Sequence, residues 1–244
     1  MTSIRYFTGL AVLAALAGCA GAPKYNPFVV PADTWRSGVR VVALTPIGVG
    51  LRDFDENRVR TVFDAPLQAA LRSYGFEIID PVKVGAFLDH LTDSAGGVYD
   101  PISGQPDTSK LAALRQIALE HLRNTYHVDA LLYPNVIVVP AQWNDNKAKW
   151  DGADQSIQST GSLILQYLGG ISARGTLPAL SLDIQMEDMS GRTLFSNRGG
   201  IHVLSRRSGR GFEDISPFEA IADTMRNSQA IQIALGPLAP VTPK

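Results

Sequence analysis

Residues 180–204 read LSLDIQMEDMSGRTLFSNRGGIHVL, and this stretch predicts a β-hairpin. Its first half alternates polar residues with an apolar set, Leu180, Leu182, Ile184 and Met186. That alternation predicts a strand with one buried face and one face in water. Ser190-Gly191 supplies the turn, and residues 192–204 return as the partner strand, interrupted by Gly199-Gly200. The hairpin implies an antiparallel part of a sheet near the end of the chain.

Upstream of this hairpin, strand and helix patterns alternate along the chain. Short apolar runs over 40–47, 76–81 and 131–139 predict strands. Pro134 in the last of them predicts a bulge or an edge position. Apolar residues recur at helical spacing over 59–74, 82–91 and 111–126. In the first of these helices, Asp64 is the expected N-cap, with Pro66 in the first turn.

Downstream of the hairpin, Ser216-Pro217-Phe218-Glu219 is a capping box with proline at the first helical position. The helix that it starts is expected to continue to about Leu235 and to stop at Gly236-Pro237. The order of elements predicts one α/β domain over 38–236, a mixed sheet packed with helices that ends in the hairpin and this helix. Residues 237–244 are expected to be a proline-rich tail.

Composition limits the kind of chemistry to expect. The 244 residues include 22 Lys+Arg and 23 Asp+Glu, and 45% are hydrophobic, which is typical of a folded protein and argues against a nucleic-acid binder. One cysteine excludes a disulfide framework and a cysteine-based metal site. Catalytic patterns such as Gly-x-Ser-x-Gly and His-Glu-x-x-His are missing from the sequence. We therefore expect no enzyme activity, no metal and no cofactor.

The N-terminal segment resembles a bacterial lipoprotein signal. A single charge at Arg5 precedes the apolar run 6–16, which is shorter than the roughly 20 apolar residues that a membrane-spanning helix needs. Leu16-Ala17-Gly18-Cys19 then matches the lipobox of that family. The resemblance implies that residues 1–18 are a signal peptide and that Cys19 carries diacylglycerol and a further acyl chain such as palmitate. The alternative is an ordinary signal peptide with an incidental cysteine.

The residues after Cys19 bear on location. Ala20 stands where many inner-membrane lipoproteins have Asp, so the resemblance favours an anchor in the outer membrane, at its periplasmic face. Residues 19–37, with Pro23, Pro27 and Pro31, are expected to be the lipidated cysteine and a tether.

The layout of the domain also resembles a known group. The lipobox, the tether, the strand Val-Val-Ala-Leu-Thr-Pro-Ile and the later Gly-Phe-Glu-Ile-Ile-Asp are similar to the LpoB/CsgG-type envelope lipoproteins. Over about residues 38–235 the order of elements continues that likeness. The resemblance implies a non-catalytic binding or accessory factor in a cell-envelope assembly, with a protein partner and the membrane, reached through Cys19, as its contacts. The identity of that partner and the oligomeric state do not follow from it.

Two groups of residues are candidates for a binding surface. Arg206, Arg207 and Arg210 are three guanidinium groups within five residues on a glycine-containing turn, which suits pairing with a partner's carboxylates. A solvated surface loop is the other interpretation of this run.

The tract 143–154 is the second candidate. Trp143, Trp150 and Asp151 predict, as a rival function, a lipid-anchored protein that binds or hydrolyses glycans, since aromatic rings and carboxylates build such clefts. Tryptophan and aspartate in a long loop more often pin the loop to the domain, which is the preferred interpretation of this tract.

Lipidation at Cys19 gives a first prediction. Replacing the thiol in Cys19→Ser removes the acyl acceptor, so acyl labelling is lost and the protein accumulates as uncleaved precursor or as soluble chain. Metabolic labelling with a fatty-acid analogue, followed by membrane fractionation, measures both effects. Unchanged labelling and fractionation in this variant would rule out the lipoprotein assignment.

Overall fold

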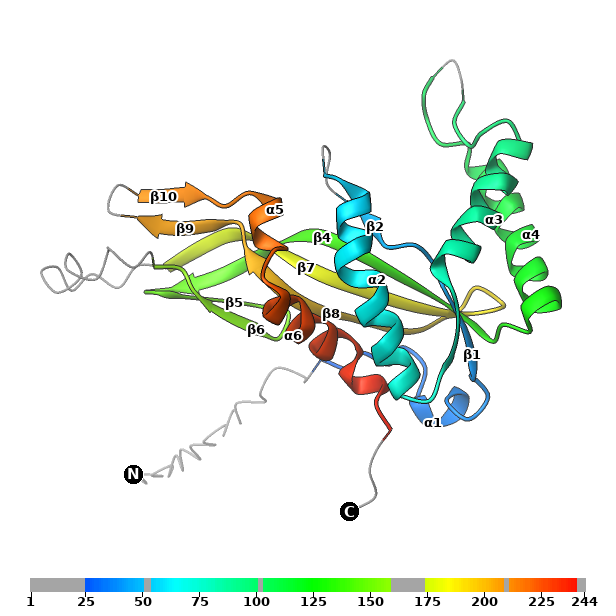
Figure 1. Cartoon of the computed structure of the whole chain (residues 1–244), viewed down its shortest axis with the longest axis horizontal. Helices are drawn as coiled ribbons and strands as arrows, with labels where there is room; N and C mark the ends of the chain where they lie inside the picture. The colour runs from blue at the N-terminus through cyan, green and yellow to red at the C-terminus, as the bar shows by residue number, and fades with distance from the viewer. Residues whose placement is uncertain (1–24, 51–53, 101–102, 159–173, 209–210, 241–244) are drawn as a thin grey trace, which may run out of the picture.

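The computed structural model describes residues 25–50, 54–100, 103–158, 174–208 and 211–240. Within them the chain forms an α/β fold, in which a curled mixed sheet is packed with helices (Figure 1). The predicted fold class is therefore confirmed. The expected signal peptide (residues 1–18), Cys19 and Arg210 lie outside the described residues. No described helix is long and apolar enough to cross a membrane.

Two long strands form the middle of the sheet. Strand β4 (Ala130–Asn144) and strand β7 (Arg174–Asp188) pair antiparallel in one continuous register, from Ala130 opposite Asp188 to Asn144 opposite Arg174. At about 3.4 Å per residue, these 15 residues span about 50 Å. The predicted strand over 131–139 covers the middle of β4, and the first strand of the predicted hairpin is the second half of β7.

The other strands attach to this pair. On one side of β4, β1 (Val41–Leu44) lies parallel between β4 and β3 (Glu77–Ile79), and β2 (Gly48–Val49) pairs further along. On the far side of β7, β8 (Thr193–Val203) completes the predicted hairpin. At the other end, β5 (Lys147–Trp150) and β6 (Ala153–Ser156) follow β4 as two further hairpin strands. A separate small sheet joins β9 (Ser205–Ser208) and β10 (Gly211–Asp214).

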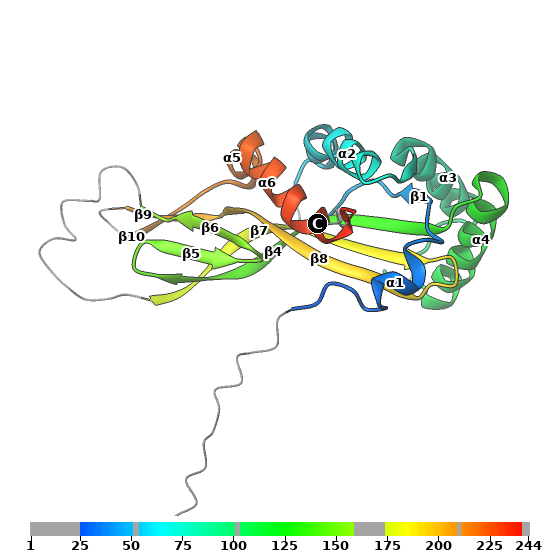
Figure 2. The ribbon, with the colours of Figure 1, turned by 90° about the horizontal axis from the view of Figure 1, so that it is seen from below.

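Helices cover the two faces of the sheet unequally. Helices α2 (Glu56–Ser73) and α6 (Thr224–Leu235) pack on one face, where the buried side chains of β4, β7 and β8 form the main core. Helices α3 (Pro81–Ser94) and α4 (Thr108–Tyr126) lie at the end of the sheet where β4 begins (Figure 2). They pack on the side chains of Ala43 and Leu131, which form a second, smaller core on the opposite face. The short helices are α1 (Ala32–Trp35), α5 (Pro217–Ala220) and the 3₁₀ turn Gly236–Leu238.

The buried side of β4 changes along its length. In the first half, even-numbered residues such as Leu132 and Val136 are fully buried, and the odd-numbered Tyr133 and Asn135 are partly exposed. Beyond Val138 the odd-numbered residue Ala141 is buried instead, while its even-numbered neighbours are exposed. The exchange follows from the curl of the sheet, which brings β6 near β8 and covers the odd-numbered face at that end.

The paired glycines of β8 are required by close packing on both faces. A Cβ on Gly199 would lie 2.0 Å from the carbonyl oxygen of Ala230 in α6, and one on Gly200 would lie 2.6 Å from the indole nitrogen of Trp150. The predicted interruption of the strand is a shift of register at this point, and β8 continues through it. The absence of side chains at the two glycines therefore lets α6 pack directly on the backbone of β8 on one face and the Trp150 ring on the other.

The expected start of the first long helix is wrong. Asp55, not Asp64, is the N-cap of α2, and its carboxylate accepts hydrogen bonds from the backbone N–H of Asn57 and Arg58. Pro66 consequently lies in the interior of the helix, on its exposed side. The apolar spacing from Val59 onward did not reveal the first polar turn of this helix.

Pro134 is not at a bulge, and it lies in an interior strand at a point where that strand is paired on one side only. It pairs with Ile184 in regular register, and β4 has neighbours on both sides. Leu132 and Val136 direct their carbonyls toward β1 and β2, accepting from Thr45 and Gly50, so by alternation the proline nitrogen faces the same side. Pairing there is interrupted between β1 and β2, which is why a residue without an N–H is tolerated.

The C-terminal helix begins as predicted but is not continuous. Ser216 caps α5 by accepting from the N–H of Glu219. The helix then ends, and Asp223 caps α6 by accepting from the N–H of Met225 and Arg226. An internal N-cap residue therefore divides one predicted helix into two.

The described part of the expected tether lies on the domain. Phe28 pairs with Phe195 at the outer edge of β8, and the backbone N–H of Val29 donates to the carbonyl of Leu194. Trp35 is buried, and its indole N–H donates to the carbonyl of Val30. Residues 25–37 therefore belong to the folded unit and cover an edge strand that would otherwise be open to pairing with another chain.

The contact at Gly199 gives a second prediction. A methyl group there meets the backbone of α6, which cannot move aside as a side chain can, so Gly199→Ala should destabilise the fold by about 1–3 kcal/mol. Urea unfolding followed by circular dichroism measures the change. The matched control is Gly236→Ala, where an added Cβ meets no atom within 4 Å and φ is −51°. Equal stability of the two variants would contradict the packing of α6 on β8.

Candidate functional site

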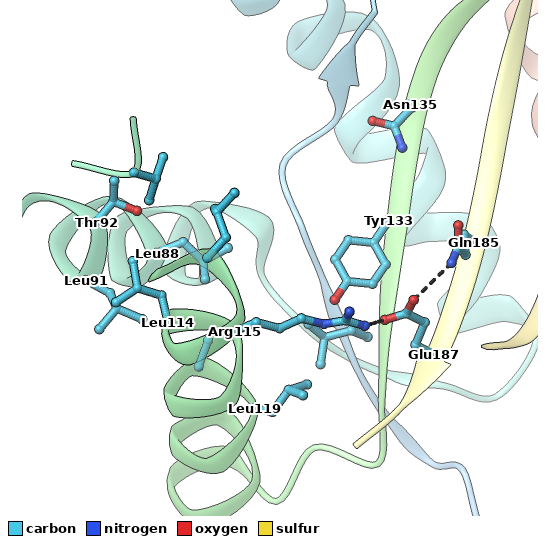
Figure 3. Close-up of a pocket in the computed structure, with 14 residues that line it drawn as sticks. Leu88, Leu91, Thr92, Leu114, Arg115, Leu119, Tyr133, Asn135, Gln185 and Glu187 are labelled. Carbon is cyan, nitrogen blue, oxygen red and sulfur yellow. Dashed lines mark hydrogen bonds and ion pairs between the residues drawn. The ribbon is translucent and has the colours of Figure 1, made fainter. Parts of the chain in front are cut away.

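A cleft opens between the α3–α4 pair and the sheet. Its volume is about 530 Å³, within the range of about 300–1,000 Å³ that small-ligand sites occupy. Helix α4 contacts the sheet with its second half, where Ala118, Leu119 and Leu122 are buried. In its first half Leu111 is 39% exposed, and the cleft lies there, between helix and strands (Figure 3).

The helical wall of the cleft is aliphatic. Helix α3 contributes leucines one turn apart, α4 contributes leucines at helical spacing, and Val98 comes from the connection between the two helices. This wall consists of Leu88, Leu91, Val98, Leu111, Leu114 and Leu119, with Thr92 and Arg115 as its polar members. The wall offers apolar surface that the domain itself does not fully cover.

The sheet side of the cleft, its floor, is polar. Odd-numbered residues of the central strands line it. Tyr133 and Asn135 from β4 and Gln185 and Glu187 from β7 point into the cleft, and Leu131 of β4 is the apolar member. Arg115 reaches across from α4 and forms an ion pair with Glu187, whose side chain is only 10% exposed. The amide of Gln185 donates to the other carboxylate oxygen of Glu187 at 2.9 Å. The helix is thus tied to the floor by a charge pair whose net charge is zero.

Tyr133 completes this polar group. Burial raises the pKa of its hydroxyl, and the nearby charge of Glu187 raises it further, while Arg115 opposes the shift. The hydroxyl also forms a side-chain hydrogen bond with Glu187, so Tyr133 belongs to the polar group that ties α4 to the floor.

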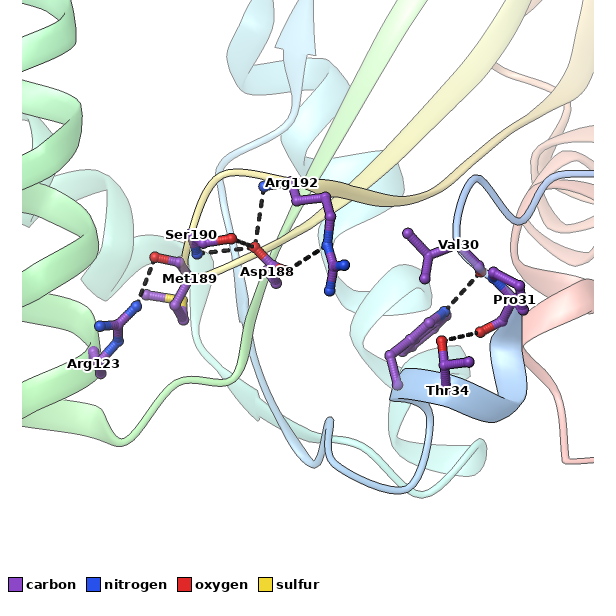
Figure 4. A network of polar contacts seen from close by, with 9 residues as sticks. Val30, Pro31, Thr34, Arg123, Asp188, Met189, Ser190 and Arg192 are labelled. Carbon is purple, nitrogen blue, oxygen red and sulfur yellow. Dashed lines mark hydrogen bonds and ion pairs between the residues drawn. The ribbon is translucent and has the colours of Figure 1, made fainter.

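The base of the cleft is held by the turn between β7 and β8 (Figure 4). Arg123 of α4 donates to the carbonyl of Met189 at 2.7 Å. Asp188 accepts from the N–H of Ser190 and of Arg192, and pairs with the Arg192 side chain at 3.1 Å. Burial acts to raise the pKa of Asp188, but the hydrogen bonds from Ser190 and Arg192 outweigh it, so the pKa lies below its usual value.

The two tryptophans of the tract 143–154 lie inside the curled end of the sheet. The tract is two hairpins, not a long loop, and Asp151-Gly152, both with positive φ, form the second turn. Trp150 is 6% exposed, and its indole N–H donates to the carbonyl of Leu180 at 3.1 Å. Asp151 accepts from the hydroxyl of Ser181 at 2.6 Å. Both contacts pin the hairpin to β7.

Trp143 occupies a different place from Asp151. It packs edge-on against Phe212 of β10, with ring centroids 5.4 Å apart, and it borders a polar hollow with Lys147 and Arg174. Asp151 borders another hollow, beside Tyr25 and Arg198. The structure therefore does not bring the three predicted ligand-binding residues together around one cavity.

The arginine run forms a hairpin instead of an open loop. Arg206 lies in β9 and forms ion pairs with Glu213 at 3.4 Å and Glu219 at 3.7 Å. Arg207 pairs with Phe212 across the hairpin, and Arg210 lies outside the described residues. The guanidinium group of Arg206 is thus already engaged with carboxylates of its own chain.

Sequence reasoning missed the cleft. The polar residues of β7 were expected to face water, yet Glu187 and Ser181 are buried. The sequence did contain a signal for it: polar residues occupy every second position of β7 from Ser181 to Glu187, and helix α4 is rich in leucine. Among the described residues no group of three or more His, Cys, Asp or Glu side chains could hold a metal ion.

Comparison with known proteins adds one structural likeness. No family model matches the chain, and no curated protein matches it. Among solved structures, the crystal structure of lipoprotein GNA1162 from Neisseria meningitidis is similar at 16% identity, over 66% of this chain and 81% of that chain, with a TM-score of 0.32. A likeness at this level assigns neither a common fold nor a common function.

The turn at Asp188 gives a third prediction. Because the folded pKa of Asp188 is lowered, the carboxylate stabilises the fold above its unfolded pKa of about 3.9, and this stabilisation is lost as pH falls through the folded value. Asp188→Asn should therefore cost about 1–2 kcal/mol at pH 7 and progressively less below pH 4. Urea unfolding across this pH range measures it, with Asp89→Asn on the exposed side of α3 as control. A cost that is independent of pH would contradict the role given to the carboxylate.

Proposed function

We propose that this chain is a lipoprotein of the bacterial cell envelope. Cys19 anchors it to the periplasmic face of the outer membrane, and its α/β domain is a non-catalytic binding factor in an envelope assembly. The observation that carries the binding role is the cleft between α3–α4 and the sheet, which has an aliphatic wall and a polar floor. Apolar walls with a few oriented polar groups are the usual composition of binding sites in proteins.

The chemistry of the floor supports binding over catalysis. A general acid or base has to exchange a proton with its substrate. Glu187 instead accepts from Arg115 and Gln185, which commits its carboxylate to holding α4 on the sheet. The hydroxyl of Tyr133 also hydrogen-bonds to Glu187, and burial raises its pKa. These groups therefore hold the helix on the floor, and the amide of Asn135 is the floor group suited to orienting a ligand.

The N-terminal segment supports a membrane-proximal position. The hydroxyl of Tyr25 donates to the carbonyl of Ser196, so the chain is already on the domain at this residue. Six residue steps separate Tyr25 from Cys19, which at about 3.4 Å each reach at most about 20 Å. A lipid on Cys19 would hold the domain close to the membrane surface, within reach of partners in the same membrane.

The cleft is favoured over the two surfaces that the sequence suggested. Arg206 is paired with Glu213 and Glu219, so a partner's carboxylate would have to displace them. Glycan binding at the tract 143–154 would need its rings together on one cavity, but Trp150 is buried and Trp143 packs against Phe212 at a separate hollow. The leucines of the cleft carry no such competing contacts on their open side.

The binding role gives a fourth prediction. Leu114→Lys introduces a charge into the aliphatic wall, so recovery of crosslinked envelope partners from intact cells should fall at least tenfold, a change of about 1.4 kcal/mol. Ile117→Lys is the matched control, since Ile117 lies one turn along α4, is 49% exposed and does not line the cleft. Crosslinking followed by quantitative mass spectrometry measures recovery.

Two results would overturn this proposal. Unchanged recovery in Leu114→Lys, combined with a loss in an Arg206→Ala, Arg207→Ala variant, would move the binding surface to the arginine hairpin. Hydrolysis of peptidoglycan, ester or phosphate substrates by the purified protein would contradict the non-catalytic role, most directly if Asp151→Asn abolished it.

A further inference from the structure

We propose that the occupant of the cleft is a short extended peptide segment of a partner protein, about three residues long, with its apolar side chains toward α3–α4. This inference rests on the proposed function, since it names what the binding factor receives. It is carried by three properties of the cleft: its volume, the difference between its two sides, and its charge.

Volume favours an extended segment over a helix. An α-helix with its side chains is about 10 Å across, so 530 Å³ would hold only about 7 Å of it, little more than one turn. An extended strand occupies about 160 Å³ per residue, from a rise of about 3.4 Å, a spacing of about 4.8 Å and a layer of about 10 Å. The cleft therefore matches about three extended residues.

The two sides of the cleft match the two sides of a strand. Successive side chains of an extended segment point in opposite directions. Apolar side chains at alternate positions would meet Leu91 and Leu114 on the helical wall, and the backbone and polar side chains would face the floor. The amide of Asn135 offers both donors and an acceptor to peptide groups. The amide oxygen of Gln185 offers a further acceptor, since its NH2 group already donates to Glu187 and Thr193.

The difference between the apolar wall and the polar floor also disfavours a lipid acyl chain as the occupant of the cleft. A hydrocarbon chain would fit the aliphatic wall but would cover the amides of Asn135 and Gln185 without offering them hydrogen bonds, and desolvating such groups costs free energy. A peptide returns hydrogen bonds to the floor while it covers the leucines.

The floor also determines the charge of the segment and how it lies. Arg115 and Glu187 neutralise each other, so the floor favours a segment without net charge at its centre. Strand β4 is paired with β1 and β7, and β7 with β4 and β8, so the segment does not extend the sheet as a further strand. It lies across the floor and is held by side-chain groups.

The experiment uses the intact lipidated protein in lipid nanodiscs, with leucine methyl groups labelled for NMR. The probe is an acetylated and amidated pentapeptide that alternates leucine and glutamine, Leu-Gln-Leu-Gln-Leu. A block isomer of the same composition, Leu-Leu-Leu-Gln-Gln, is the control peptide. We expect saturable shifts at Leu88, Leu91 and Leu114, and binding at least tenfold weaker for the block isomer. Binding should be at least tenfold weaker in Leu114→Lys and unchanged in Ile117→Lys.

Three results would overturn the inference. They are equal binding of both peptides, no leucine shift with either peptide, and displacement of the alternating peptide by a monoacyl phospholipid that itself shifts the same leucines. If any of these occurred while Leu114→Lys still lost its crosslinked partners, the occupant would be wrong and the proposed function would stand. If the alternating peptide bound but crosslinking were unaffected by Leu114→Lys, the cleft would bind peptides and the proposed function would fail.

Discussion

The antiparallel pairing of β4 with β7 is the interaction on which the other elements depend. Its continuous register over 15 residues gives a ladder about 50 Å long, to which β1 and β2 attach on one side and β8 on the other. Strands of this length twist, because each neighbouring pair is rotated by roughly 20–25°. A ladder this long cannot keep one face toward the same layer of helices from end to end.

The change of buried side along the ladder creates the cleft. Near Ala130 the even-numbered face carries α2 and α6, and at the far end the odd-numbered face is enclosed by β5 and β6. Next to the small core that α3 and the second half of α4 form on the odd-numbered face, mostly polar residues of β4 and β7 line the cleft. Arg115 bridges the gap to Glu187. The position of α4 is therefore set by this charge pair, by the hydrogen bond from Arg123 to Met189 and by the apolar contacts around Leu122.

Local patterns in the sequence predicted which strands and helices form more successfully than they predicted which of their residues are buried. The alternation from Leu180 to Met186 and the capping box at Ser216 are local signals, and both elements are present. The same alternation placed Glu187 in water, because period alone does not tell which layers cover a face. Asp151-Gly152 is a strong hairpin signal between strands, and Trp150 just before it is a core residue of the curled sheet. Burial at these sites is decided by contacts between distant segments, such as Trp150 with Leu180, which no local window contains.

The central claim is that α4 holds to the sheet by its second half and leaves the cleft open along its first half. Amide hydrogen exchange on the intact protein, read residue by residue, tests it directly. We expect the amides of β4 and β7 between Ala130 and Val139 and between Ala179 and Asp188 to exchange most slowly, with residues 118–126 of α4 clearly slower than residues 111–116. Uniform protection along α4, as slow as in β4, would mean that the whole helix is packed on the sheet and would contradict the cleft.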